Sequence, residues 1–316
     1  MFFLTLRLLH SCLNENIPSG RSIPANPSEN VIIDNCFFIR NQVFSGSGGI
    51  ISIEGVQISL SLKYTIIHES SSSLYGGALF TYGLSKSEIK MCCGSCCSSG
   101  YDHFGYIAVI STNDHIIYGL SLTKCSSGSQ GEDAINIACG YEQITQTNMS
   151  NNFANYVAGP LIQNPQGMKM SYCTYSNNRP SQSVCFRSQQ GSGSIHVLNS
   201  NFVSNTSPLA SGIFETKHSS VFSLDSCIFY GNSNTLFYAA TGSITISNSY
   251  ISHLGTTQYG TVYNNNNAAT VEETYLIMHF GTFYCPANNQ LVIESKRLGI
   301  RSISLMNSIV LVLVLA

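Results

Sequence analysis

The chain has 316 residues, enough for two compact domains or for one elongated repeat domain. Only 9% of its residues are charged, whereas 43% are hydrophobic, and Ser, Asn, Thr and Gly supply most of the remaining polarity. This composition suits strands and tight turns but not surface helices, which are usually rich in Glu, Lys and Arg. A net charge of −2 excludes general electrostatic attraction to nucleic acid, so no nucleic-acid partner is expected.

Taken in chain order, the sequence divides into three parts. Residues 1–30 are expected to form an apolar N-terminal segment and a loose cap, and the segment 1–9 is a marginal signal sequence because Arg7 interrupts it. Residues 31–300 are expected to form one repeat domain. Residues 301–316 are a short tail whose last eight residues, 309–316, are apolar but too few to span a bilayer, so membrane attachment stays open.

The repeat domain is recognised by Phe-x-x-Asn segments that begin at Phe38, Phe202 and Phe229. Steps of 21 to 30 residues connect ten landmark positions: Asn41, Glu69, Ser99, Cys125, Asn152, Asn178, Asn205, Asn232, His253 and His279. The residue three positions before each landmark is apolar or Cys: Phe38, Ile66, Cys96, Leu122, Met149, Tyr175, Phe202, Phe229, Tyr250 and Leu276. A repeat of about 27 residues follows.

Each repeat contains short alternating strands, such as 195–199 and 244–248, that are separated by Gly or Asn turns. One such unit cannot bury its own apolar face and must stack on its neighbours. We therefore predict an all-β fold, a single-stranded right-handed parallel β-helix (a β-solenoid, pectin-lyase-like) of about ten turns. Asn41, Asn152, Asn178, Asn205 and Asn232 should form an inward amide ladder beside an apolar column that includes Phe38, Phe202, Phe229 and Tyr250. The 30-residue step into Ser99 predicts a bulging loop near residues 86–100, and the 21-residue step before His253 is the weakest point of the register.

The segment Gly76-Gly77-Ala78-Leu79, together with the repeated Phe-x-x-Asn, resembles the polymorphic outer membrane proteins, a family of bacterial surface adhesins with similar β-helical proteins in parasitic protists. The resemblance spans roughly residues 31–285 and includes Gly48-Gly49-Ile50 as a near match. It implies display at a surface and a role in adhesion or as an antigen.

Four cysteines, Cys92, Cys93, Cys96 and Cys97, are the sharpest local motif and are weak candidates for a metal site. Buried free thiols or local disulfides are the preferred interpretation, because no second Cys or His pair completes the ligand set. Cys36, Cys173 and Cys227 share a second register, as laddered core positions do. Of two glycosylation sequons, the one at Asn148 is the candidate, because Asn205 should point inward.

An enzyme built on such a fold needs clustered carboxylates, commonly with Arg. Asp102, Asp114 and the pair Glu132-Asp133 are the best acidic cluster, but turn Asp residues are the simpler explanation, and no catalytic residue is assigned. A groove with at least two carboxylates and an Arg or aromatic platform would favour an enzyme, whereas a face of Ser, Thr and Asn would oppose it.

We therefore predict a noncatalytic β-helix at the cell surface or secreted, with an adhesion or antigenic role, host or glycan ligands and no cofactor. A carbohydrate-active enzyme, lyase-like or hydrolase-like, is the alternative. A structural or decayed relative without a ligand is the third hypothesis.

Overall fold

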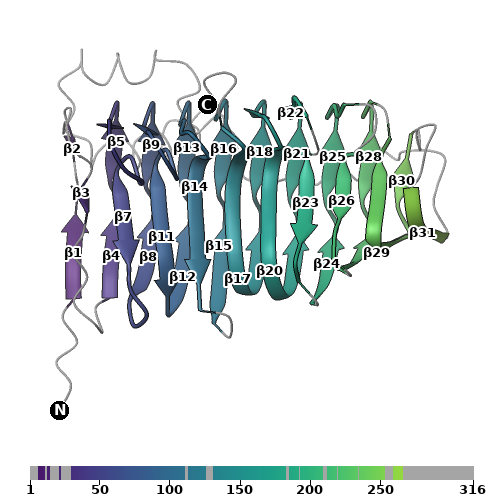
Figure 1. Ribbon diagram of the computed structural model, residues 1–316, viewed down its shortest axis with the longest axis horizontal. Coiled ribbons are helices and arrows are strands. Elements are labelled where there is room, and N and C mark those ends of the chain that lie inside the picture. Colours follow the sequence, from purple (N-terminus) through teal and green to yellow (C-terminus); the bar gives the residue numbers. More distant parts are fainter. Residues whose placement is uncertain are drawn as a thin grey trace, which may run out of the picture.

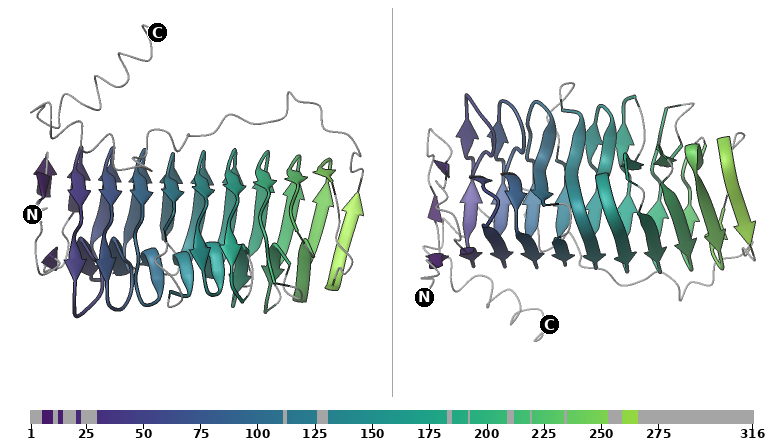
Figure 2. Two further views of the ribbon diagram at one scale, coloured as in Figure 1. Left: turned by 90° about the horizontal axis from the view of Figure 1, so that it is seen from above. Right: turned by 60° about the horizontal axis from the view of Figure 1, so that its bottom comes forward.

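The computed structural model describes residues 6–10, 13–14, 21–22, 30–110, 113–125, 131–182, 185–191, 193–208, 212–218, 220–233, 235–252 and 259–265. Within these residues the regular structure is all β-strand, and the strands stack in parallel into an elongated β-solenoid (Figures 1 and 2). The predicted all-β parallel solenoid is confirmed. The described residues contain no helix long and apolar enough to cross a membrane.

One 17-stranded sheet forms two walls of the solenoid. Its strands are β1 (Leu6–His10), β3 (Arg21–Ser22), β4 (Asn30–Asp34), β7 (Ile51–Glu54), β8 (Ser59–Lys63), β11 (Leu79–Leu84), β12 (Lys86–Lys90), β14 (Asp102–Val109), β15 (Asp114–Tyr118), β17 (Asp133–Thr145), β20 (Val157–Ser171), β23 (Phe186–Gln189), β24 (Ser194–Leu198), β26 (Phe214–Thr216), β27 (Val221–Asp225), β29 (Phe237–Ser247) and β31 (Tyr259–Asn265). The long strand β17 runs through both walls, since its first half pairs with β14 and its second half with β15.

A ten-stranded sheet forms the third wall. Its strands are β2 (Leu13–Asn14), β5 (Phe37–Ile39), β9 (Ile66–His68), β13 (Cys93–Ser95), β16 (Ser121–Thr123), β18 (Asn148–Ser150), β21 (Thr174–Ser176), β25 (Asn201–Val203), β28 (Ile228–Tyr230) and β30 (Tyr250–Ile251). Two further pairs, β6 (Gln42–Val43) with β10 (Ser71–Ser72) and β19 (Phe153–Ala154) with β22 (Arg179–Pro180), lie where the chain returns to the first wall.

The turns are counted along the first wall, where β7, β11, β14, β17, β20, β23, β26 and β29 follow one another. These strands mark seven complete turns in the described part of the chain, with partial turns before β7 and after β29. The number is slightly below the ten that the repeat predicted, because His253 and His279, the last two landmarks, lie outside the described residues.

The corners on either side of the third wall use residues in the left-handed backbone region. One corner has Asn35, Tyr64 and Met91 at φ of 52°, 46° and 51°, and the other has Arg40 and Glu69 at 55° and 53°. Each turn therefore bends sharply at single residues. The predicted landmark Glu69 is such a corner residue, and the inward position of its turn is the buried Ser70, one residue later.

The asparagine ladder holds four successive turns together. Asn152, Asn178 and Asn205 each donate from the side-chain amide to the Oδ1 of the next Asn, at 3.2, 3.1 and 3.1 Å, and the last acceptor is Asn232. Each Oδ1 also accepts the backbone N–H of the turn before, as Asn205 Oδ1 does from Asn178 at 3.0 Å. The ladder therefore satisfies buried polar backbone that no side chain within the same turn reaches. Asn41 is buried as well, but its Nδ2 has no partner among the described residues.

An apolar column lies beside the ladder, and the strand register defines its members. In this register each member of the column pairs with the next one along the solenoid: Phe38, Ile67, Gly94, Leu122, Met149, Tyr175, Phe202, Phe229 and Ile251. The Phe202 and Phe229 rings stack at 5.2 Å. Two predicted members, Ile66 and Tyr250, lie one residue away and therefore on the opposite face of the sheet, while Cys96 lies beyond the strand at a corner. Tyr250 pairs with Ile228, and its place in the column is taken by Ile251.

The same correction removes the predicted loop at residues 86–100. That segment forms β12 and β13, which pair with β8 and β9 in the regular register. The landmark of this turn is the buried Cys97, since Ser98 donates its N–H to Ser70 just as Ser71 does to Asn41. The apparent 30-residue step came from placing this landmark two residues late, at Ser99, and the preceding one a residue early, at Glu69 instead of the buried Ser70.

The glycine pair Gly76-Gly77 has a steric role. Gly76 has a φ of +58°, which L side chains rarely adopt. A Cβ on Gly77 would overlap the carbonyl oxygen of His103 in the next turn. Gly48 and Gly49 occupy the same places one turn earlier and donate their N–H groups to Tyr75 and Gly76. The two glycine motifs thus occupy the same position in two consecutive turns of the solenoid.

Candidate functional site

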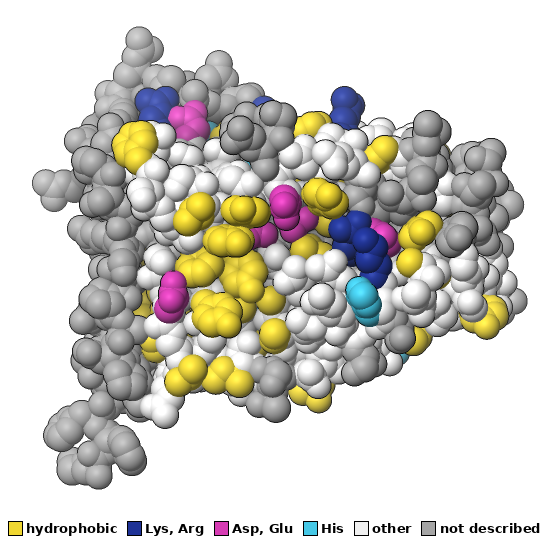
Figure 3. Space-filling view, in the orientation of Figure 1, with side chains coloured by type: hydrophobic (Ala, Val, Ile, Leu, Met, Phe, Trp, Pro, Cys, Tyr) yellow, Lys and Arg dark blue, Asp and Glu magenta, His cyan; other side chains and the backbone are white. Residues whose placement is uncertain are grey.

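A groove of about 570 Å³ crosses the outer surface of the first wall. Its lining comes from strands β11, β14, β17, β20 and β23 and from the loops before them: Tyr75, Phe80, Tyr82, Tyr101, Asp102, Tyr106, Glu132, Asp133, Asn136, Tyr156, Leu161, Gln163, Arg187 and Gln189. On the space-filling surface, hydrophobic side chains gather over the N-terminal half of this face, and acidic and then basic side chains follow toward the C-terminal turns (Figure 3).

One half of the groove is an aromatic platform. Tyr75 and Tyr101 stack with ring centroids 4.6 Å apart and an interplanar angle of 18°, and Phe80 stacks on Tyr106 at 5.6 Å. The stacking follows from the fold, because residues at equivalent positions of adjacent turns lie one strand spacing apart. Tyr82 is 58% exposed at the edge of this platform. The platform offers broad apolar ring faces with hydroxyl groups around them.

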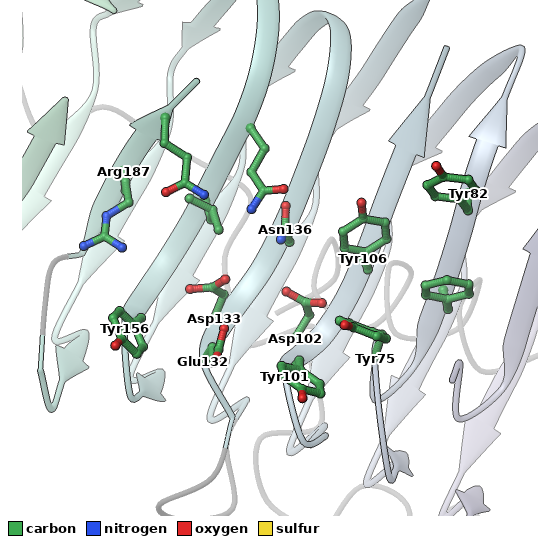
Figure 4. Close-up of a pocket in the computed structure, with 14 residues that line it drawn as sticks. Tyr75, Tyr82, Tyr101, Asp102, Tyr106, Glu132, Asp133, Asn136, Tyr156 and Arg187 are labelled. Carbon is green, nitrogen blue, oxygen red and sulfur yellow. The ribbon is translucent and has the colours of Figure 1, made fainter. Parts of the chain in front are cut away.

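The middle of the groove contains a pair of carboxyl groups. Asp102 and Asp133 are register partners on β14 and β17, and both point into the groove between Tyr75 and Tyr156 (Figure 4). They are only 2% and 4% exposed. Burial, followed by the charge of Asp133, raises the pKa of Asp102 well above its ordinary value. Burial raises the pKa of Asp133 to about 8, although Arg187 opposes this effect. The ionised form of both carboxyl groups is therefore disfavoured in the groove.

Asn136 completes the floor of the groove. Its side chain hydrogen-bonds to Asp102, which partly counteracts the rise in the pKa of that carboxyl. The other oxygen of the carboxyl, Asp102 Oδ2, and the amide oxygen of Asn136 have no partner among the described residues, and both atoms are buried. The floor of the groove thus contains two buried oxygen atoms that form no hydrogen bond with the described residues.

The far end of the groove carries a charged cluster. Arg187 forms an ion pair with Glu215, to which its Nε donates at 2.6 Å, and Lys217 approaches the same carboxylate at 3.3 Å. The Arg187 guanidinium also lies over the Tyr156 ring, 5.8 Å from its centroid. Glu215 therefore neutralises much of the positive charge at this end.

The acidic cluster anticipated from the sequence is partly assembled. Asp102, Glu132 and Asp133 meet in the groove, whereas Asp114 is exposed on the second wall and does not line it. Sequence reasoning missed the aromatic platform and Arg187. A signal did exist, since Tyr75, Tyr101 and Tyr156 each precede a first-wall strand in successive or nearly successive turns.

A second polar group, also missed, lies inside the solenoid. His115 and Glu142 are register partners with 0% and 1% exposure. His115 Nδ1 and both carboxyl oxygens of Glu142 have no partner among the described residues. Burial raises the pKa of Glu142 to about 9 and lowers the pKa of His115 to about 4, so both are neutral at pH 7.

The four clustered cysteines do not converge. Cys92 joins a buried column that includes Cys36, Cys173 and Cys227, as the equivalent backbone hydrogen bonds of their turns show, and burial raises its pKa to about 12. Cys93 is disulfide-bonded, Cys96 is half-buried at a corner, and Cys97 is fully buried. No group of three or more His, Cys, Asp or Glu in the described part of the chain could hold a metal ion.

The glycosylation candidate and the chain ends complete the placement of the predicted residues. Asn148 lies on β18 and is 3% exposed, which opposes glycan attachment to the folded chain. At the N-terminal end, β1 pairs with β4 and β2 pairs with β5, so strands within the predicted cap segment extend the sheets. Leu276 and the tail 301–316 lie outside the described residues.

Comparisons with known proteins give no match. No family model matches the chain. No curated protein and no solved structure matches it either. The function must therefore be argued from the groove itself.

Proposed function

We propose that this protein is a noncatalytic β-solenoid that binds glycans through the groove on its first wall and acts in adhesion at a cell surface or after secretion. The observation that carries the proposal is the aromatic platform beside a buried polar floor. Sugar rings present apolar C–H faces, which pack on aromatic rings, and hydroxyl groups, which need polar partners. Tyr75, Tyr101 and Tyr106 supply the aromatic rings. Asp102 and Asn136 supply the polar partners.

Surface display is supported by the sequence motifs, not by the groove. The Gly-Gly and Phe-x-x-Asn segments that resemble the polymorphic outer membrane proteins form structural columns of the solenoid, consistent with a passenger domain of that kind. Labelling of intact cells with an impermeant biotin reagent should mark this protein. Protection of the protein in intact cells, with labelling only after lysis, would contradict surface display.

The binding test is a glycan array probed with the wild-type protein and with the double variant Tyr75→Ala/Tyr101→Ala. Tyr141→Ala is the matched control, because Tyr141 is also exposed, at 48%, but does not line the groove. We expect the wild type and the control to bind the same glycans and the double variant to lose them. Absence of binding by the wild type, or equal binding by the double variant, would refute the proposal.

A carbohydrate-active enzyme is the second candidate, and the groove meets the criterion that the sequence set for it, because the Asp102–Asp133 pair lies beside Glu132, an Arg and an aromatic platform. In hydrolysis, Asp133 would donate its proton to the glycosidic oxygen as the C–O bond breaks, while Glu132 accepts a proton from the attacking water. Burial raises the pKa of Asp133 to about 8, as a general acid requires, so an activity assay decides between binding and this reaction. Release of new reducing ends from a bound oligosaccharide, abolished by Asp133→Asn, would establish the enzyme instead.

A further inference from the structure

The floor of the groove has a specific hydrogen-bonding requirement. The Asn136 side chain is bonded to Asp102, and this leaves Asp102 Oδ2 and Asn136 Oδ1 without partners among the described residues. Burial disfavours the ionised form of Asp102, and since one of its oxygens interacts with the Asn136 amide, a proton on this carboxyl belongs on the unpartnered Oδ2. The floor therefore presents one donor, from Asp102, and one acceptor, from Asn136.

A hydroxyl group is the sugar substituent that satisfies both atoms. Its oxygen accepts from the Asp102 carboxyl and its hydrogen is donated to Asn136 Oδ1. A carboxylate of a uronic acid only accepts, so it would leave Asn136 Oδ1 unpartnered and buried, which is unfavourable. The floor thus accepts a hydroxyl and disfavours the carboxylate of a uronic acid at this position, although the other hydroxyls of that sugar stay compatible with it.

The charge of the groove acts in the same direction. Arg187 is the single Lys or Arg among the described residues that line it, and Glu215 holds that guanidinium in an ion pair. Lys217 is directed to the same Glu215 carboxylate. Glu132 is exposed in the lining, beside the carboxyl pair (Figure 4). Glu132 would repel an anionic glycan. The cation in the described lining, Arg187, is already paired with a carboxylate and offers little compensation.

We propose that the groove selects uncharged oligosaccharides and rejects polyuronates, with Asp102 and Asn136 binding one sugar hydroxyl and Glu132 repelling carboxylates. This inference rests on the proposed glycan binding and names the class of glycan. It places specificity in three residues that do not belong to the aromatic platform.

The test is isothermal titration of the full chain at neutral pH with tetrasaccharides of galactose, mannose and glucose and with the matching tetramers of their uronic acids. The best neutral ligand should bind at least about ten-fold more tightly than its uronate counterpart. Equal or tighter binding of the uronate would overturn this inference while leaving glycan binding intact. Absence of binding to every tetrasaccharide would overturn both proposals.

Three variants separate the contributions. Glu132→Gln should raise the affinity for the uronate several-fold and thereby reduce the ratio of the neutral affinity to the uronate affinity. Asn136→Leu removes the amide at the floor while keeping its shape and should weaken binding of the neutral ligand by about ten-fold or more, whereas Asp102→Asn keeps an uncharged donor and should stay within about three-fold of the wild type. Unchanged uronate binding in Glu132→Gln, or wild-type affinity for the neutral ligand in Asn136→Leu, would refute the assigned roles, and circular dichroism spectra identical to wild type establish that each variant is folded.

Discussion

Replacing Glu142 with Gln should stabilise the protein at neutral pH and have little effect in mild acid. The Glu142 side chain is 1% exposed inside the solenoid, next to the equally buried His115. Burial raises its pKa from the ordinary 4.5 to about 9. Neither of its carboxyl oxygens has a hydrogen-bond partner among the described residues, and its own backbone amide only partly opposes the effect of burial on the pKa.

The sign of the effect follows from the two protonation states. Above pH 4.5 the carboxyl is ionised in the unfolded chain, while the folded chain keeps its proton up to about pH 9. In this range the group favours the unfolded chain by about 1.4 kcal/mol more for each pH unit. At pH 7.5, three units above the lower limit, the penalty is about 4 kcal/mol. Gln has no such penalty, because it does not ionise.

Urea unfolding followed by circular dichroism at pH 4.5 and pH 7.5 measures this difference. Glu142→Gln should raise the free energy of unfolding at pH 7.5 by up to about 4 kcal/mol and change it little at pH 4.5. Glu54→Gln is the matched control, since Glu54 is exposed on β7 and should show no pH-dependent gain. A Glu142→Gln effect that is the same at both pH values would refute the argument that burial keeps this carboxyl neutral.

Three further substitutions or reagents test other parts of the fold. Asn205→Ala removes two donated and two accepted ladder hydrogen bonds and should lower the free energy of unfolding by about 3 kcal/mol. The control, Gln143→Ala at an exposed position, should change it by less than about 0.5 kcal/mol. Equal effects of the two substitutions in urea unfolding would contradict a stabilising role for the ladder. Gly77→Ala brings a methyl group into the His103 carbonyl and should destabilise the chain far more than Ala78→Gly in the same assay, and a harmless Gly77→Ala would show that the turns are not this closely packed. Half-buried Cys96 should react with iodoacetamide in the native protein well before the fully buried Cys173, and mass spectrometry showing equal rates would contradict their placement.

The architecture could be predicted from the sequence because each turn of the solenoid repeats the same pattern of residues. The Phe202 and Asn205 registers recur every 27 residues or so, and every recurrence is an independent indication of the same column. Errors in register arose where a turn lacked both signals. The turn containing Cys97 has a thiol in the ladder position and Gly94 in the apolar column, so neither landmark residue was present to fix its register.

The site could be predicted only in part, for a physical reason. Asp102 and Asp133 are 31 positions apart in the sequence, and only the strand register makes them neighbours. Their neutral state depends on burial, which composition and spacing do not report. The aromatic platform went unnoticed because Tyr75 and Tyr101 lie in loops, outside the periodic positions that revealed the repeat.

The central claim, that glycans bind in this groove, is tested most directly by fluorine NMR of the protein with 3-fluorotyrosine in place of tyrosine. Single Tyr→Phe variants assign the signals of Tyr75, Tyr101 and Tyr106 in the groove and of Tyr141 and Tyr172 outside it. On titration with a glycan identified by the array, the groove signals should shift in a saturable manner while the outside signals stay fixed. Shifts confined to Tyr141 or Tyr172, with the groove signals unchanged, would contradict the account.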